Sequence, residues 1–164
     1  MWKKIGIALA IILVIIQFIR PEKNISGNET LAIQTKYRLP NEVENIFQVS
    51  CYDCHSNTTK YPWYSNVQPA AWFLADHVND GKKHLNFSEF TNMPLFVQNH
   101  KLEEIKEMVE KKEMPLPSYT YFGLHQEANL TDAQRQKIIA WADSQMNYLK
   151  KVYPADSLVF PKRK

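Results

Sequence analysis

The sequence predicts an all-α domain of four helices, preceded by an apolar segment at the N-terminus. Two observations favour helices: apolar residues recur at spacings of three and four along four stretches, and prolines stand at the ends of those stretches. A third observation disfavours a hairpin-rich β fold, because the 164 residues include only four glycines. No stretch repeats at a fixed period, and the length suits a single domain.

The first element is an uncharged apolar run at residues 5–19, with Lys3 and Lys4 before it and Arg20 after it. As a helix this run reaches about 22 Å, whereas a bilayer core of about 30 Å normally takes about 20 residues. We expect residues 1–20 to be a transmembrane anchor, because no small-residue cleavage site follows. A cleaved signal segment is the alternative. Either assignment places the rest of the chain on the periplasmic or outer side of the cytoplasmic membrane.

Beyond the apolar segment, the sequence divides into a linker, a domain and a tail. Residues 21–38 are polar without a sustained apolar period, so we expect a linker there. Residues 39–153 hold the predicted helices and form the expected domain, and residues 154–164 form a C-terminal tail. The first helix is predicted to begin with Asn41 as N-cap, with Glu44 completing a capping box, and to continue into a pair of cysteines.

Three further helices follow from the apolar spacing and from the positions of the prolines. Thr131 and Gln134 form the capping-box pattern that begins the last of them. Met114-Pro115 ends the helix before it, since proline cannot continue the backbone hydrogen bonds. The expected ranges are 69–81, 99–112 (beginning at Asn99 or His100) and 131–150.

The charge balance excludes one class of partner. Without Lys3, Lys4 and Arg20, which flank the apolar run, the 20 basic residues fall to 17, equal to the 17 acidic ones. A nearly neutral body lacks the basic surface that binds phosphate backbones, so we expect no nucleic-acid partner. No pair of titratable residues has the spacing of a catalytic acid and base, and we expect no small-molecule substrate.

The chemistry of the chain is concentrated in Cys51-Tyr52-Asp53-Cys54-His55. On a helix, thiols three residues apart project from the same side, where both can reach the vinyl groups on one edge of a porphyrin. His55 lies over that side and can offer a ring nitrogen to iron, so the motif predicts one covalently attached c-type haem. A thiol–disulfide couple or a zinc site is the alternative, but the first favours a βαβ context and the second needs four ligands.

His55 is thus the expected first iron ligand, and Met114 is the expected second one. Met114 lies 59 residues after His55, at a helix end before a proline, where its thioether can turn inward. Met93 also precedes a proline, and Met108 lies on an apolar helical stripe, so both are alternatives. His77 lies on the apolar face of its helix and is the candidate for ligation by two histidines.

These residues resemble a known family: the small haem-binding domains of the cytochrome c superfamily found in exported bacterial proteins. The resemblance covers residues 39–150 and implies thioethers at Cys51 and Cys54, His55 as proximal ligand and Met114 as distal ligand, in a cytochrome c-like fold. The aromatic segment before Met114 is longer than in a minimal class I cytochrome c, which leaves the Met114 assignment open. The matching residues are Cys51-Tyr52-Asp53-Cys54-His55-Ser56, Tyr61-Pro62-Trp63-Tyr64, Gly81, Leu85-Asn86-Phe87-Ser88, Met114-Pro115-Leu116, Tyr119 and Trp141.

The expected function is that of a membrane-tethered monohaem c-type cytochrome, which exchanges single electrons with redox partner proteins and is not an enzyme. Ligation by histidine and methionine leaves no open position on the iron and therefore suits electron transfer. The main alternative is a haem-based sensor or a peroxidase-like enzyme, in which the distal ligand is displaceable. A third reading is an interaction module that needs haem only to fold.

Overall fold

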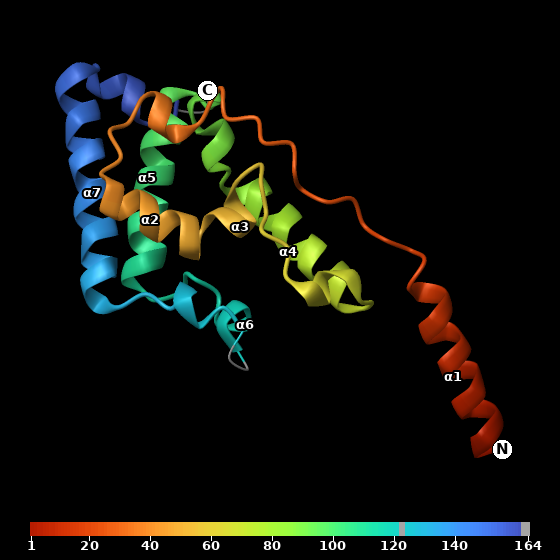
Figure 1. The fold of residues 1–164 in the computed structure, drawn as a ribbon. Coiled ribbons are helices and arrows are strands. Elements are labelled where there is room, and N and C mark those ends of the chain that lie inside the picture. The colour runs from red at the N-terminus through yellow and green to blue at the C-terminus, as the bar shows by residue number, and fades with distance from the viewer. Residues whose placement is uncertain (122–123, 162–164) are drawn as a thin grey trace.

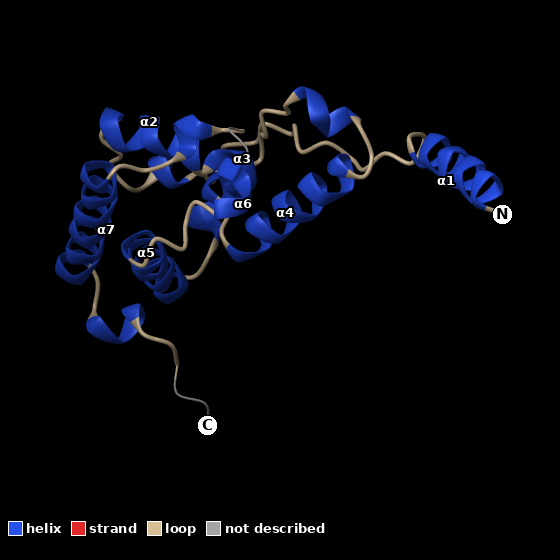
Figure 2. Cartoon of the chain, turned by 90° about the horizontal axis from the view of Figure 1, so that it is seen from below, coloured by secondary structure: helices blue, strands red, loops and turns tan. Residues whose placement is uncertain are grey.

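The structure of the chain is a computed structural model that describes residues 1–121 and 124–161. Over these ranges the chain forms helices and connecting segments, with an isolated β-bridge between Ile25 and Thr58 and no strand (Figure 2). The predicted all-α class is therefore confirmed. The α-helices are α1 (Trp2–Ile16), α2 (Asn41–Ser50), α3 (Tyr52–His55), α4 (Ala70–His84), α5 (Leu95–Glu110), α6 (Pro117–Thr120) and α7 (Asp132–Val152).

Two of the longest helices, α5 and α7, lie side by side at the end of the molecule away from α1 (Figure 1). Helix α2 packs on α7, and α3 continues from α2 toward α4, which extends away from the α5–α7 pair. The hydrophobic core lies where α2, α5 and α7 meet. Phe47 of α2 packs edge-on against Trp141 of α7, with ring centroids 5.2 Å apart, and the Trp141 indole donates to the Arg38 carbonyl at 3.0 Å.

Helix α1 projects from the opposite end of the molecule and buries none of its residues (Figure 1). Within residues 1–121 and 124–161, no helix combines the length and the apolarity needed to cross a membrane, so the predicted transmembrane anchor is not supported. The chain after α1 is nevertheless fixed to the start of α4. Gln68 donates from its backbone to the Gln17 side chain at 2.9 Å, and the Trp72 indole donates to the Ile19 carbonyl at 3.1 Å.

The ends of the helices test the sequence-based predictions. The capping box at the start of α7 is confirmed, because Thr131 accepts from the Gln134 amide and the Gln134 side chain accepts from the Thr131 amide. The capping box at α2 is wrong: Pro40 is the N-cap, Asn41 is already helical, and no side chain caps this end. Helix α5 begins at Leu95, before the predicted start, since Pro94 serves as its N-cap.

The segments predicted as linker and tail both contribute to the packed domain. In residues 21–38, Ile33 and Tyr37 are fully buried, and in residues 154–164 Leu158 joins the same core. Isolated apolar residues in otherwise polar stretches show no period, so their burial depends on contacts with distant parts of the chain.

Buried Gln98 on α5 provides a test of this packing. Its side-chain oxygen accepts from the Tyr37 hydroxyl at 2.7 Å and from Lys36, and its amide donates to the Met93 carbonyl. Gln98→Met keeps the volume but leaves the buried Tyr37 hydroxyl without a partner, so we expect unfolding to become easier by about 2 kcal/mol in denaturant titrations. Gln48→Met on the exposed face of α2 is the matched control and should cost little; equal losses would contradict this role for Gln98.

Candidate functional site

The sequence predicted that the helix before the cysteine motif continues into it, and this prediction is wrong. Helix α2 ends at Ser50, and Cys51 leaves the helical region with φ −129° and ψ −45°. The short helix α3 then carries the rest of the motif, with the His55 amide donating to the Cys51 carbonyl at 3.0 Å. Cys51, Cys54 and His55 thereby remain on one side of the chain and line the same cavity.

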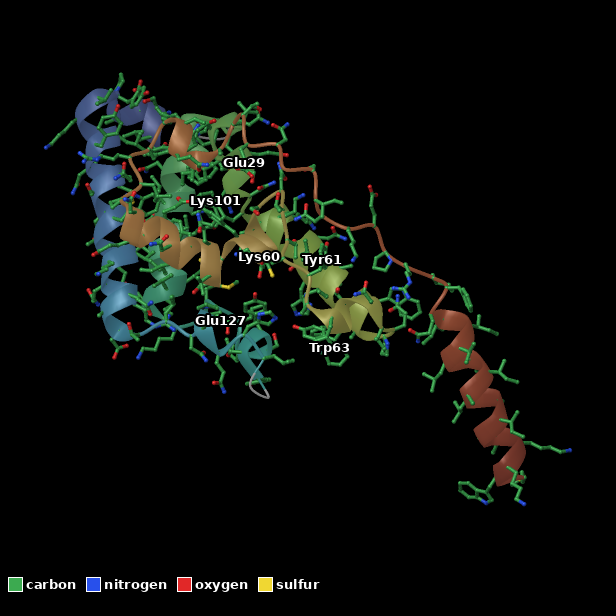
Figure 3. All side chains as sticks on the ribbon, in the orientation of Figure 1. Glu29, Lys60, Tyr61, Trp63, Lys101 and Glu127 are labelled. Atoms are coloured by element: carbon green, nitrogen blue, oxygen red, sulfur yellow. The ribbon has the colours of Figure 1, made fainter. Side chains whose placement is uncertain are left out.

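This cavity has a volume of about 840 Å³, which is within the range of ligand and cofactor sites. Its walls come from α3, α4, α5 and the segment from Met114 through α6. Trp63 and Lys101, which both line it, lie well apart in Figure 3, Trp63 beside the start of α4 and Lys101 on α5. Most of the lining is apolar or aromatic, including Phe47, Phe73, Leu74, Phe87, Ile105, Met108, Val109 and Leu116.

His55 is oriented by a backbone contact at the end of α4. Its Nδ1 lies 2.9 Å from the Leu85 carbonyl, and since a carbonyl can only accept, Nδ1 carries the proton in this contact. Nε2 is then the nitrogen left for a metal. Burial lowers the pKa of His55, against the opposing effect of the backbone hydrogen bonds, and so favours the neutral imidazole that ligates iron.

Gly81 of α4 allows that helix to approach the motif. A Cβ atom at position 81 would lie 2.5 Å from the Cys54 carbonyl oxygen and 3.1 Å from the Cys54 Cβ, closer than side-chain carbons lie to other atoms. A glycine is therefore required here for close packing of α4 against α3. This contact brings the Leu85 carbonyl, four residues along the chain, to His55.

Both thiols are free and partly buried. Burial raises the pKa of Cys51 to about 12 and that of Cys54 to about 11, with smaller contributions from Cys54 and Asp53 respectively. Thiol–disulfide catalysis depends on a lowered thiol pKa, so this environment disfavours the dithiol alternative. In the described part of the chain, no three His, Cys, Asp or Glu side chains are arranged to hold a metal ion such as zinc.

The candidates for the second iron ligand differ in position. Met114, Met108 and His77 all line the cavity, whereas Met93 is absent from its lining and packs against the hydrophobic core. His77 Nδ1 lies 2.9 Å from the Phe73 carbonyl, so that, as in His55, Nε2 is the nitrogen left for a metal. Met114 therefore lines the same cavity as the cysteine motif, as Met108 and His77 do, although Met114 lies 59 residues after His55.

The backbone of Met114 is held in place by the end of α5 and by α7. Lys112 has a left-handed φ of 60°, which ends α5, and the Met114 amide donates to the Met108 carbonyl at 3.2 Å. Arg135 of α7 donates to the carbonyls of Val109 and Met114 at 3.0 and 2.9 Å. The chain therefore leaves α5 in a defined direction, toward the cavity.

A set of polar contacts at the cavity was not predicted from the sequence. The Tyr119 hydroxyl donates to Asp53 Oδ2 at 2.7 Å, and its ring stacks on His125 at a centroid distance of 4.4 Å. His125 Nε2 lies 2.7 Å from the Tyr64 hydroxyl. Burial, followed by the Asp53 contact, raises the pKa of Tyr119 and keeps its hydroxyl protonated as a donor. Tyr119 lies 66 residues from Asp53, and His125 lies 61 residues from Tyr64, so no spacing rule pairs them.

A helical domain with a large apolar cavity, and with two thiols and one oriented imidazole on its wall, has the features of a cofactor-binding protein. The chain belongs to the family described as Haem-binding domain, because the model of that family matches residues 11–144. This membership supports haem as the ligand. No curated protein and no solved structure matches the chain.

Proposed function

We propose that the chain is a monohaem c-type cytochrome that carries single electrons between partner proteins. The main support is the cavity itself, which is lined by Cys51, Cys54, His55 and Met114. Haem, when bound, supplies one-electron oxidation and reduction at its iron. The helices α3, α4 and α5 would then surround one covalent haem in a cytochrome c-like manner.

Cys51 and Cys54 are the proposed attachment residues. They would hold haem through two thioether bonds, in which each thiol is added across one vinyl group and its hydrogen is placed on the other vinyl carbon. No atom is lost, and the addition requires no external oxidant. Their burial on the cavity wall, three residues apart and next to His55, supports this assignment.

His55 Nε2 and the Met114 sulfur are the proposed iron ligands. Ligation by histidine and methionine raises the reduction potential and leaves no open coordination position, which suits electron transfer better than peroxide chemistry or gas sensing. The hydrogen bond from Arg135 to the Met114 carbonyl supports a fixed distal ligand over a displaceable one.

We further propose that the domain works on the periplasmic or outer side of the cytoplasmic membrane. Support comes from the apolar helix α1, which carries Lys3 and Lys4 in its first turn and is followed by Arg20, a pattern typical of export signals and tethers. It also comes from the export that c-type haem attachment requires. Its partners there would be redox proteins. The nearly neutral body supports neither a nucleic acid nor a small-molecule substrate as partner.

The experiment that tests attachment is the spectrum of the exported protein in alkaline pyridine. The wild type is expected to give a c-type haemochrome, and the Cys51→Ala/Cys54→Ala double variant is expected to lose it and to release haem on extraction with acidified organic solvent. Tyr52→Phe, within the same motif, is the control and should retain the haemochrome. A wild type without this band, or a double variant that keeps it, would contradict covalent attachment.

A further inference from the structure

The Tyr119–Asp53 hydrogen bond connects the two regions that supply the proposed iron ligands. Asp53 lies between Cys51 and Cys54 in the motif, two residues before His55. Tyr119 lies on α6, in the segment that begins with Met114. Both side chains line the cavity, and their oxygen atoms are 2.7 Å apart. A single contact therefore joins the proximal and distal sides of the site.

The segment from Met114 to Tyr119 is fixed at each end. At its start, Arg135 donates to the Met114 carbonyl at 2.9 Å, which fixes the backbone to α7. At its end, Tyr119 is bonded to Asp53, which fixes the segment to α3. Arg135 thus positions the segment relative to the core, whereas Tyr119 positions it relative to the residues that would hold haem.

Asp53 is well placed to accept this hydrogen bond. Its other oxygen, Oδ1, accepts from the Lys60 amide at 2.9 Å, and its carbonyl accepts from the Thr59 hydroxyl at 2.6 Å. The Asp53 side chain is therefore held in place by Lys60, independently of its contact with Tyr119. The Tyr119 ring lies parallel to His125, at an interplanar angle of 7°, which orients the hydroxyl toward Asp53. Both partners are fixed by other contacts, which lowers the entropy lost when they pair.

We propose that the Tyr119–Asp53 hydrogen bond holds the segment that begins with Met114 against the cysteine motif, so that Tyr119 is a positioning residue for Met114 as the second iron ligand. This inference rests on the proposed function. A hydrogen bond to a charged acceptor is stronger than one between neutral groups, and its loss would allow the segment that carries Met114 to leave the site more often.

Tyr119→Phe tests the inference, because it removes only the hydroxyl and keeps the ring that stacks on His125. The attached haem should be unchanged in alkaline pyridine. The near-infrared band of methionine-to-iron charge transfer should weaken, and the reduced protein should bind carbon monoxide about tenfold more tightly, which corresponds to a loss of about 1.4 kcal/mol. Tyr148→Phe, on α7 and 45% exposed, is the matched control and should leave both properties unchanged.

A double-mutant cycle separates this role from a general loss of stability. In the Asp53→Ala background, Tyr119→Phe should add no further change in carbon monoxide affinity, because the partner of the hydroxyl is already missing. Additive effects would overturn the assignment of Asp53 as the partner. Hydrogen exchange of the amides of Leu116 and residues 118–121 should quicken in Tyr119→Phe, which reports on the segment without using the iron.

The outcomes distinguish this inference from the proposed function. If the wild type shows the near-infrared band and Tyr119→Phe keeps it, with unchanged carbon monoxide affinity and exchange, the inference is overturned while the proposed ligation stands. If the wild type lacks the band and Met114→Ala binds carbon monoxide no more tightly than the wild type, the ligation itself is overturned, and with it the role of Tyr119 in positioning a ligand.

Discussion

Met114→Ala is expected to keep haem attached, as measured in alkaline pyridine, and to abolish the near-infrared methionine–iron band. The reduced variant should bind carbon monoxide about a hundredfold more tightly, if the closed form makes up about 99% of the wild-type population. Its reduction potential should fall, because a thioether ligand favours reduced iron. A redox titration and a carbon monoxide titration measure these effects.

Met108→Ala is the matched control, since Met108 also lines the cavity but lies on the helical stripe of α5. It is expected to retain the band and to lose only packing energy. If instead Met108→Ala or a His77 variant removes the sixth ligand while Met114→Ala does not, the distal assignment must be revised to that residue. If the wild type itself binds carbon monoxide or peroxide readily, a sensor or peroxidase-like function is favoured.

Gly81→Ala is expected to have the second large effect, a loss of about 2 kcal/mol of stability. Alanine gains about 1 kcal/mol over glycine in a helix, but the added Cβ, 2.5 Å from the Cys54 carbonyl oxygen, costs about 3 kcal/mol through overpacking. The midpoint of thermal unfolding should therefore fall by about 6 °C. The yield of attached haem should fall as well, because moving α4 displaces the Leu85 carbonyl from His55.

Gly6→Ala on α1 controls for the substitution itself. Gly6 is also helical, but nothing lies within 4 Å of the position where its Cβ would be, so this variant should not lose stability. A Gly81→Ala variant as stable as the wild type would show that α3 and α4 can separate without cost, and would remove the packing argument for this glycine.

Local patterns in the sequence predicted the helices well, because helical spacing and caps depend on neighbouring residues. Thr131 and Gln134 at the start of α7 are a confirmed example. The start of α5 was placed too late, although Pro94 provided a signal for a helix beginning just after it. The break at Cys51 was missed because the apolar spacing continues through it, and the packing of α3 against α4 cannot be seen in that spacing.

The candidate site shows the same division between local and distant information. The Cys51–His55 motif could be recognised in sequence because its chemistry depends on spacings of three and four residues. The pairing of Asp53 with Tyr119 could not be recognised, since 66 positions separate them and many tyrosines and acidic residues offer equivalent partners. Gly81 could be named as part of a resemblance, but its close contact with Cys54 required the fold.

The short segment after α1 limits where the domain can be cut away from its N-terminal helix. Asn24 donates its side-chain amide to the Ser56 carbonyl at 2.8 Å, and Asn28 accepts through its carbonyl from buried Asn57, just after the Cys51–His55 motif. A protease site or a recombinant start point downstream of Asn28 would strip these partners from the loop that follows His55. A shortened chain intended for spectroscopy should therefore begin between Ile16 and Lys23. Such a chain loses α1 but keeps Asn24 and Asn28, which contact the loop after His55.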